Sequence, residues 1–188
     1  MRSVTYSMAV SLDGFITGPD GGIDWTTPDD EIFRLVTDEM RGVGVHFMGR
    51  RLYEAMLFWE TADEETDFDP GLREWARLWN VLPKVVFSST LTEVVGDHTR
   101  LATGSVAEEI ERWRAEPGDG EIAVGGAGLA AQVAGLGLID EYRARVCPVL
   151  LGGGTPYFAR DERRVELERV ESRPLASGIV YLRHRVKR

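Results

Sequence analysis

The strongest constraint on the fold is a change of pattern along the chain. Over about the first two-thirds, apolar runs of strand length alternate with amphipathic segments of helix length, whereas the last third holds strand-like runs without helices between them. Alternation favours parallel strands joined by crossover helices, and consecutive strands favour antiparallel pairing. The pattern predicts an α/β fold with one mixed sheet, mostly parallel with antiparallel C-terminal strands, and helices on both faces.

Apolar periodicity and capping residues place the expected elements. One helix is expected to have Thr27 as its N-cap and Pro28 in its first position, and to end at Gly42. Another begins with a capping box formed by Ser105 and Glu108. The remaining expected helices cover 52–58, the segment around Trp75 and Trp79, and a segment that ends near 136. The two tryptophans are interpreted as core residues. The expected strands are 4–11, 43–48, 85–87, 121–124, 141–149, 165–171 and 178–185.

Composition limits the classes of function. The length of 188 residues favours a single domain, 1–188. With 31 acids and 22 bases, the net charge of −9 argues against nucleic-acid partners and membrane surfaces. A single cysteine, Cys147, and three scattered histidines supply neither a disulfide nor a metal motif, so no metal is expected. Without a long apolar run or a signal-peptide pattern, we expect a soluble, cytoplasmic protein.

Three predicted strands end in small or basic residues. These ends are Gly49-Arg50-Arg51, Ser88-Ser89 and Gly125-Gly126-Ala127-Gly128. In an open α/β sheet, ligands bind outside the carboxyl ends of the strands. Glycines there let the backbone approach a phosphate, and a following helix presents free N–H groups. Arginine and hydroxyl groups add donors, so the three ends predict a site for a phosphorylated nucleotide.

Taken in order, these motifs resemble the dihydrofolate reductase fold. The segments that carry the likeness are Ala9-Val-Ser-Leu-Asp13-Gly14-Phe-Ile16, Met48-Gly49-Arg50-Arg51, Ser88-Ser89 and Gly125-Gly126-Ala-Gly128. Ser11-Leu-Asp-Gly14 and Pro148-Val-Leu-Leu-Gly-Gly-Gly-Thr-Pro156 look like the RibD C-terminal branch, the pyrimidine reductases of riboflavin biosynthesis such as 5-amino-6-(5-phosphoribosylamino)uracil reductase, and their stand-alone relatives. The resemblance spans about 3–186. It implies an NADPH-dependent reductase that acts on a CH–NH or C=N bond of a small polar or phosphorylated heterocycle.

The resemblance also implies roles for individual cofactor-binding residues. Ala9 and Ile16 would flank the nicotinamide, Gly49, Arg50 and Arg51 would grip the cofactor phosphates, Ser88 and Ser89 would lie near the 2′-phosphate, Gly125 and Gly126 would form a paired glycine with a cis peptide bond, and Gly128 and Leu129 would begin the pyrophosphate-binding helix. One departure is Leu52, which stands where dihydrofolate reductases place a threonine hydroxyl on the phosphate.

Substrate contacts are harder to assign. Trp25-x-x-Pro28-x-Asp30 resembles the start of the first helix in dihydrofolate reductases, so Asp30 is the candidate catalytic residue, although helix capping alone also selects acids there. Trp25, Arg34 and Tyr53 are candidate substrate-binding residues, and Arg34 has the spacing to pair with Asp30. Glu31 and Arg34 put charge where a folate reductase has an apolar wall, which disfavours folate.

Other functions remain open. A non-catalytic nucleotide-binding protein would use the same fold, and a dihydrofolate reductase stays an alternative. A Rossmann enzyme using flavin or NAD would require an all-parallel sheet and would prefer NAD. Residues 141–186 supply strands without covering helices, so a partner is needed there, and a homodimer is the commonest solution; the resemblance points the same way.

Overall fold

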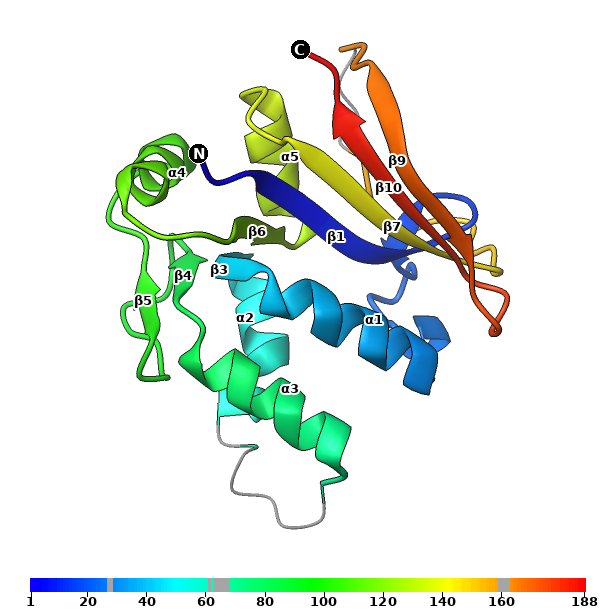
Figure 1. Ribbon diagram of the computed structural model, residues 1–188, viewed down its shortest axis with the longest axis horizontal. Helices are drawn as coiled ribbons and strands as arrows, with labels where there is room; N and C mark the ends of the chain where they lie inside the picture. Colours follow the sequence, from blue (N-terminus) through cyan, green and yellow to red (C-terminus); the bar gives the residue numbers. More distant parts are fainter. Residues whose placement is uncertain (27–28, 61, 63–67, 159–162) are drawn as a thin grey trace.

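The computed structural model describes residues 1–26, 29–60, 62, 68–158 and 163–188. An eight-stranded sheet with the order β5-β4-β3-β6-β1-β7-β10-β9 forms its centre (Figure 1). In that order the strands are Thr99–Leu101, Lys84–Phe87, Val43–Gly49, Glu121–Gly125, Val4–Ser11, Glu141–Cys147, Val180–Val186 and Leu167–Pro174. A separate two-stranded sheet pairs β2 (Phe15–Thr17) with β8 (Thr155–Pro156).

Strand directions confirm the predicted mixed sheet. Every neighbouring pair from β5 to β7 is parallel, and β10 pairs antiparallel with both β7 and β9. The antiparallel strands come from the C-terminal third, as the change of pattern predicted. The all-parallel sheet that a Rossmann enzyme would require is therefore absent from the part of the chain that the structure describes.

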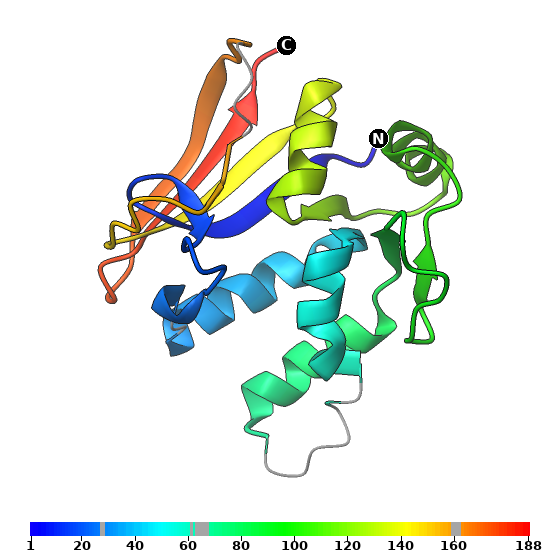
Figure 2. The same ribbon diagram turned by 180° about the vertical axis from the view of Figure 1, so that it is seen from behind.

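Helices cover both faces of the sheet, as predicted. They are α1 (Asp30–Arg41), α2 (Arg50–Met56), α3 (Pro70–Val81), α4 (Val106–Ala115) and α5 (Ala127–Gly135), with 3-10 turns η1 (Asp24–Thr26) and η2 (Leu57–Glu60). The first three pack on one face, and α4 and α5 pack on the other (Figure 2). None of the described helices is long and apolar enough to cross a membrane.

The tryptophans of α3 belong to the core, as predicted. Trp75 and Trp79 are 7% and 1% exposed, and their rings stack with centroids 6.5 Å apart. They pack with Met40 of α1 and Met48 of β3 in the apolar cluster between the sheet and the first three helices. Burying aromatic side chains of this size contributes much of the stability of a domain.

The helix starts follow the capping residues, with one correction. The N-cap of α1 is Asp29, whose carboxylate accepts the N–H of Ile32 at 2.8 Å. The prediction of Thr27 as N-cap is therefore wrong, because the Asp29 carboxylate fills that role; Thr27 and Pro28 themselves lie outside the described residues. The predicted end of this helix at Gly42 and the capping box at the start of α4 are both confirmed.

Other boundaries differ for local reasons. The strand expected over 141–149 ends at Cys147, because Pro148 has no N–H to continue the ladder. The helix expected over 52–58 begins at Arg50 and gives way to a 3-10 turn after Met56. Three strands were not predicted, namely β2, β5 and β8; each is only two or three residues long.

Candidate active site

Three predicted cofactor segments meet at one edge of the sheet. In the strand ladders, Gly49 lies opposite Phe87, which precedes Ser88, and Met48 lies opposite Gly125. The carboxyl ends of β4, β3 and β6 are thus neighbours, and the segments that follow them lie side by side (Figure 1). This arrangement is the one in which parallel sheets bind ligands.

Glycines leave open space along this edge. A Cβ atom added at Gly49 or at Gly128 would meet no other atom within 4 Å. Gly126, the N-cap of α5, has a φ of 88°, which glycine adopts at little cost. The first turn of α5 contains no acid and has no side-chain cap, so its N–H groups remain for a ligand. The edge therefore fits the pyrophosphate of a dinucleotide.

Side-chain donors stand beside the open space. Arg50 lies near Glu54, with its Nε 3.8 Å from Oε1, and Arg51 is exposed and has no ion-pair partner among the described residues. The Ser88 hydroxyl accepts the N–H groups of Thr90 and Leu91 and so shapes the turn. Ser89 is exposed and makes no side-chain hydrogen bond within the described part of the chain. Two arginines and two serines therefore follow neighbouring strand ends at this edge.

Gly125 and Gly126 are joined by a trans peptide bond, so the implied cis bond is not present. The positive φ of Gly126 turns the chain from β6 into α5 instead. A Cβ at Gly125 would collide with Leu52 Cδ2 and His46 Cε1. Leu52 thus packs against the paired glycine in the place where the related fold has a hydroxyl. The side chain of Leu129 is 5% exposed and packs into the core.

The two residues expected to flank the nicotinamide join different clusters. Ala9 packs in the cluster beneath α1, whereas Ile16 is buried in the core on the α4 and α5 side. Asp13 accepts hydrogen bonds from the Ser11 hydroxyl and from the N–H groups of Leu151 and Gly152. These bonds lower the pKa of Asp13, the Ser11 bond most strongly. Asp13 is therefore a turn residue that ties the first strand to the loop after β7.

A cavity of about 240 Å³ that opens to solvent lies between the sheet and helices α1, α2 and α3. Its polar end is lined by Ser7, Glu39, Arg143 and Arg145, and its aromatic end by His46, Trp75, Trp79, Met40 and Met56. Gly125 belongs to the same wall. The cavity therefore adjoins the glycine segment at the carboxyl edge of the sheet.

A hydrogen-bonded network closes the polar end. The Ser7 hydroxyl donates to Glu39 Oε2 at 2.8 Å, and Arg145 Nη1 donates to both Ser7 Oγ at 2.9 Å and Glu39 Oε2 at 3.2 Å. The Tyr181 hydroxyl donates to Glu39 Oε1 at 2.5 Å. Burial, and then the negative charge of Glu39, raise the pKa of Tyr181 well above its ordinary value, so Tyr181 stays a donor.

Arg143 is held by carboxylates behind this network. Its Nε donates to Glu141 Oε1 at 2.6 Å, and its Nη2 donates to Glu121 Oε1 at 2.5 Å. Burial opposes the charge of Arg143, but the bonds to Glu121 and Glu141 prevail and raise its pKa. Arg183 also donates to Glu141, at 3.0 Å. The Arg143 guanidinium is therefore compensated by two carboxylates, and Glu141 is shared between two arginines.

His46 is a neutral member of the aromatic end. Burial lowers its pKa to about 4, and the neighbouring Lys84 charge also disfavours the imidazolium form. Its ring lies edge-on to Trp79, with centroids 5.8 Å apart. His46 Nδ1 and Trp75 Nε1 are buried without a hydrogen-bond partner among the described residues. Such orphaned groups are uncommon in folded proteins and call for an explanation.

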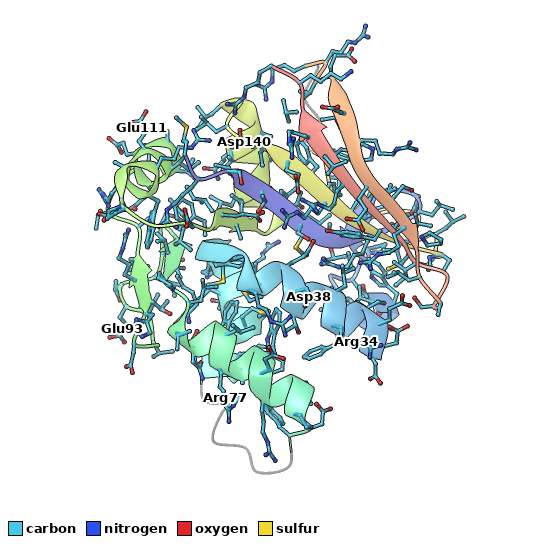
Figure 3. All side chains as sticks on the ribbon, in the orientation of Figure 1. Arg34, Asp38, Arg77, Glu93, Glu111 and Asp140 are labelled. Carbon is cyan, nitrogen blue, oxygen red and sulfur yellow. The ribbon has the colours of Figure 1, made fainter. Side chains whose placement is uncertain are left out.

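The predicted substrate residues lie outside this cavity. Asp30 and Arg34 are both exposed on α1, with no ion pair between them in the described structure (Figure 3 labels Arg34). Trp25 packs against the cluster beneath α1. Tyr53 is buried, and its hydroxyl accepts the N–H of Val95 at 2.8 Å, which fixes a loop. The expected pairing of Arg34 with Asp30 is not observed, because both side chains extend into solvent.

Sequence reasoning missed Ser7, Glu39 and Arg145, although a signal for two of them was present. Glu39 lies four residues after Leu35, on the buried face of α1. Arg145 belongs to a strand in which Glu141 and Arg143 also alternate on one face. Charged residues that occupy the regularly spaced, buried positions of a helix or strand require oppositely charged or hydrogen-bonding partners. They were therefore candidates for a buried polar site.

Comparison with known proteins identifies the family to which the chain is similar and structures that share its fold. The model of the RibD C-terminal domain matches residues 2–181. The uncharacterized protein YyaP of Bacillus subtilis is 31% identical over 181 residues, covering 96% of this chain and 93% of that protein. A putative riboflavin biosynthesis protein from Shewanella sp. PV-4 has 25% identity and a TM-score of 0.79, with both chains fully covered. Acinetobacter baumannii RibD has 15% identity and a TM-score of 0.71, and the match covers 100% of this chain and 58% of that one.

Proposed function

This chain belongs to the RibD C-terminal domain family, and on that premise we propose that it is an NADPH-dependent reductase of a small polar or phosphorylated heterocycle. The cofactor would lie along the carboxyl edge of the sheet. The substrate would enter the cavity beneath α1. Bound NADPH supplies a hydride, and the protein supplies binding and orientation.

One observation carries this proposal: the open glycine edge and the cavity beneath α1 meet at Gly125. The free N–H groups of α5 and the space at Gly49 and Gly128 suit a pyrophosphate. Arg51 and Ser89 are available for an additional phosphate, which favours NADPH over NADH. A reductase needs donor and acceptor side by side, and the shared wall at Gly125 supports that arrangement.

Titration calorimetry with NADPH and NADH tests the cofactor assignment. We expect NADPH to bind more tightly, because one charge-assisted hydrogen bond contributes about 1.5–3 kcal/mol, or roughly 10- to 150-fold in affinity. Arg51→Gln should remove most of that preference. Arg77→Gln, at an exposed arginine of α3 with no ion pair among the described residues (Figure 3), is the matched control and should retain it. Equal affinities for the two cofactors in the unaltered protein would disprove the assignment.

The alternative is a nucleotide-binding protein without catalysis. The two functions differ in whether NADPH is consumed. Oxidation of NADPH, followed by absorbance in the presence of candidate heterocycles, supports the reductase. Binding of NADPH without oxidation across such a panel favours the alternative.

We also propose that the protein is a homodimer. Val146 of β7 lies opposite Val180 of β10, and Ala144 lies opposite Leu182, all half-buried on the sheet face turned away from α1. On that side α5 lies beside β7, where Ala144 and Val146 pack against the core, whereas no helix in the described part of the chain lies over β10 (Figure 2). An apolar sheet face of this kind gains stability from a second copy.

A further inference from the structure

The polar end of the cavity pairs an acid and a base that both face the interior. Arg145 Nη1 and Glu39 Oε2 are 3.2 Å apart, and each side chain is 12% exposed. The Ser7 hydroxyl bonds to both of them and fixes their relative position. Because both groups are held from the sheet and from α1, the pair presents a fixed pattern to a ligand.

Charges around this end cancel. Glu39 pairs with Arg145, Arg143 bonds to two acids, and Arg183 bonds to one of them. The carboxylates of Glu39, Glu121 and Glu141 pair with the guanidinium groups of Arg143, Arg145 and Arg183, and the exposed Arg185 also lies 3.9 Å from Glu141. A phosphoryl group, with a charge of about −1.5 to −2, would enter this balanced interior beside the Glu39 carboxylate. Burying an unpaired charge is costly, so the cavity favours an uncharged ligand.

Hydrogen-bonding capacity remains on both members of the pair. Among the described residues, Arg145 Nε and Nη2 have no acceptor, since both of its hydrogen bonds use Nη1. Glu39 Oε1 accepts only the Tyr181 hydroxyl and retains a second acceptor position. A donor next to an acceptor is complementary to an amide-type edge, in which C=O accepts from Arg145 and the adjacent N–H donates to Glu39.

The opposite end of the cavity suits a flat apolar ring. It is lined by the stacked indoles of Trp75 and Trp79 and by the neutral imidazole of His46. Trp75 is more than nine-tenths buried, and its Nε1 has no partner in the described part of the chain. Leaving such a group unpaired is unfavourable, and a ligand with a ring acceptor would relieve it.

We propose that this cavity selects an uncharged, planar molecule with an amide-type edge and an apolar ring, and that Glu39 and Arg145 determine this specificity. The inference rests on the proposed function only in taking the cavity as the substrate site. It narrows that function, because it excludes a phosphoryl group from the cavity.

Three probes test the recognition pattern by calorimetry without NADPH. 2-Quinolinone carries the amide edge and the ring, N-methyl-2-quinolinone lacks the N–H, and quinoline-2-carboxylate carries a negative charge. We expect 2-quinolinone to bind at least about ten-fold more tightly than either of the others, the factor expected for one hydrogen bond to a charged group. Equal or weaker binding of 2-quinolinone, or no binding up to its solubility limit, would overturn the proposal.

Glu39→Gln provides a charge test. This variant leaves Arg145 unbalanced, so quinoline-2-carboxylate should now bind more tightly than 2-quinolinone. Glu111→Gln, the same change at an exposed position of α4 (Figure 3), should keep the original order. An unchanged order in folded Glu39→Gln would show that Glu39 is not the determinant. If thermal melting shows that this variant does not fold, the probe series on the unaltered protein decides.

The cofactor titration separates this inference from the proposed function. Selective 2-quinolinone binding without NADPH binding supports the cavity inference and overturns the reductase. NADPH binding without the probe selectivity overturns the cavity inference alone.

Discussion

Gly128→Ala should raise the stability of the protein and lower its affinity for NADPH. Gly128 is the second residue of α5, and an added Cβ meets nothing within 4 Å. In a helix, replacing glycine by alanine reduces the entropy of the unfolded chain without strain. We therefore expect the free energy of unfolding to rise by about 0.4–1 kcal/mol.

The affinity should change in the opposite direction. If the pyrophosphate approaches the backbone at Gly128, a methyl group there displaces it from at least one N–H donor. Losing one charge-assisted hydrogen bond costs about 1.5–3 kcal/mol, which corresponds to roughly 10- to 150-fold weaker binding. Urea unfolding measures the stability, and titration calorimetry measures the affinity. Partial unfolding would lower both quantities, so the opposite signs identify a local effect.

Gly135→Ala is the matched control at the other end of the same helix. Gly135 also has nothing within 4 Å of an added Cβ. It should show a similar gain in stability and an unchanged affinity for NADPH. NADPH binding by Gly128→Ala at the original affinity would refute the placement of the cofactor. Equal weakening in both variants would show that the effect does not come from contact at Gly128.

Three further predictions concern acid stability, substrate and assembly. Glu109 is fully buried and bonded to Arg100, which helps hold its pKa at about 2 despite burial. The ionised Glu109 carboxylate therefore adds of order 3 kcal/mol to the free energy of unfolding above about pH 4.5, and this stabilisation is lost as the pH falls towards 2. Urea unfolding of Glu109→Gln should accordingly depend less on pH in that window. The protein should not turn over dihydrofolate, because the Glu31 carboxyl group, which accepts the Ala176 N–H, is polar where the resemblance to folate reductases implies an apolar wall; turnover of about 1 per second or faster would contradict this. Light scattering should give about twice 21.0 kDa, and Val180→Asp should shift the mass to that of the monomer; a monomeric mass for the unaltered protein would reject the dimer.

Local signals in the sequence accounted for most of the sheet and helices. The Ser105 capping box and the helix end at Gly42 were predictable, because each depends on residues a few positions apart. The start of α1 was misplaced because several consecutive residues can cap a helix, and only the structure shows that Asp29 does so. Strands β5 and β8 carry too few residues for a periodic signal.

The site was predictable only where it depends on the backbone. Glycine-rich strand ends indicate that a ligand can approach the backbone, whatever side chains lie around them. The pairing of β3 with β6 then brings Gly49 and Gly125 to one edge of the sheet. The cavity depends on contacts between distant segments. Glu39 and Arg145 are 106 residues apart, and their pairing requires α1 to pack against the face of the sheet that β7 presents. Asp30, chosen by its position in a motif, lies in solvent.

Gly125 links these two kinds of site. Its neighbours at the edge are glycines and free N–H groups, which suit a phosphate-bearing cofactor, and its other side is the wall of the cavity. Leu52 and His46 occupy the space that a side chain at this position would need. The carboxyl edge of the sheet is formed by backbone groups that belong to the fold. It therefore limits which cofactor could bind there, but it does not limit the choice of substrate. Under the proposal made above, the substrate contacts side chains of α1 and β7 instead, and Glu39 and Arg145 determine its specificity; function then depends on these side chains and not on the fold alone.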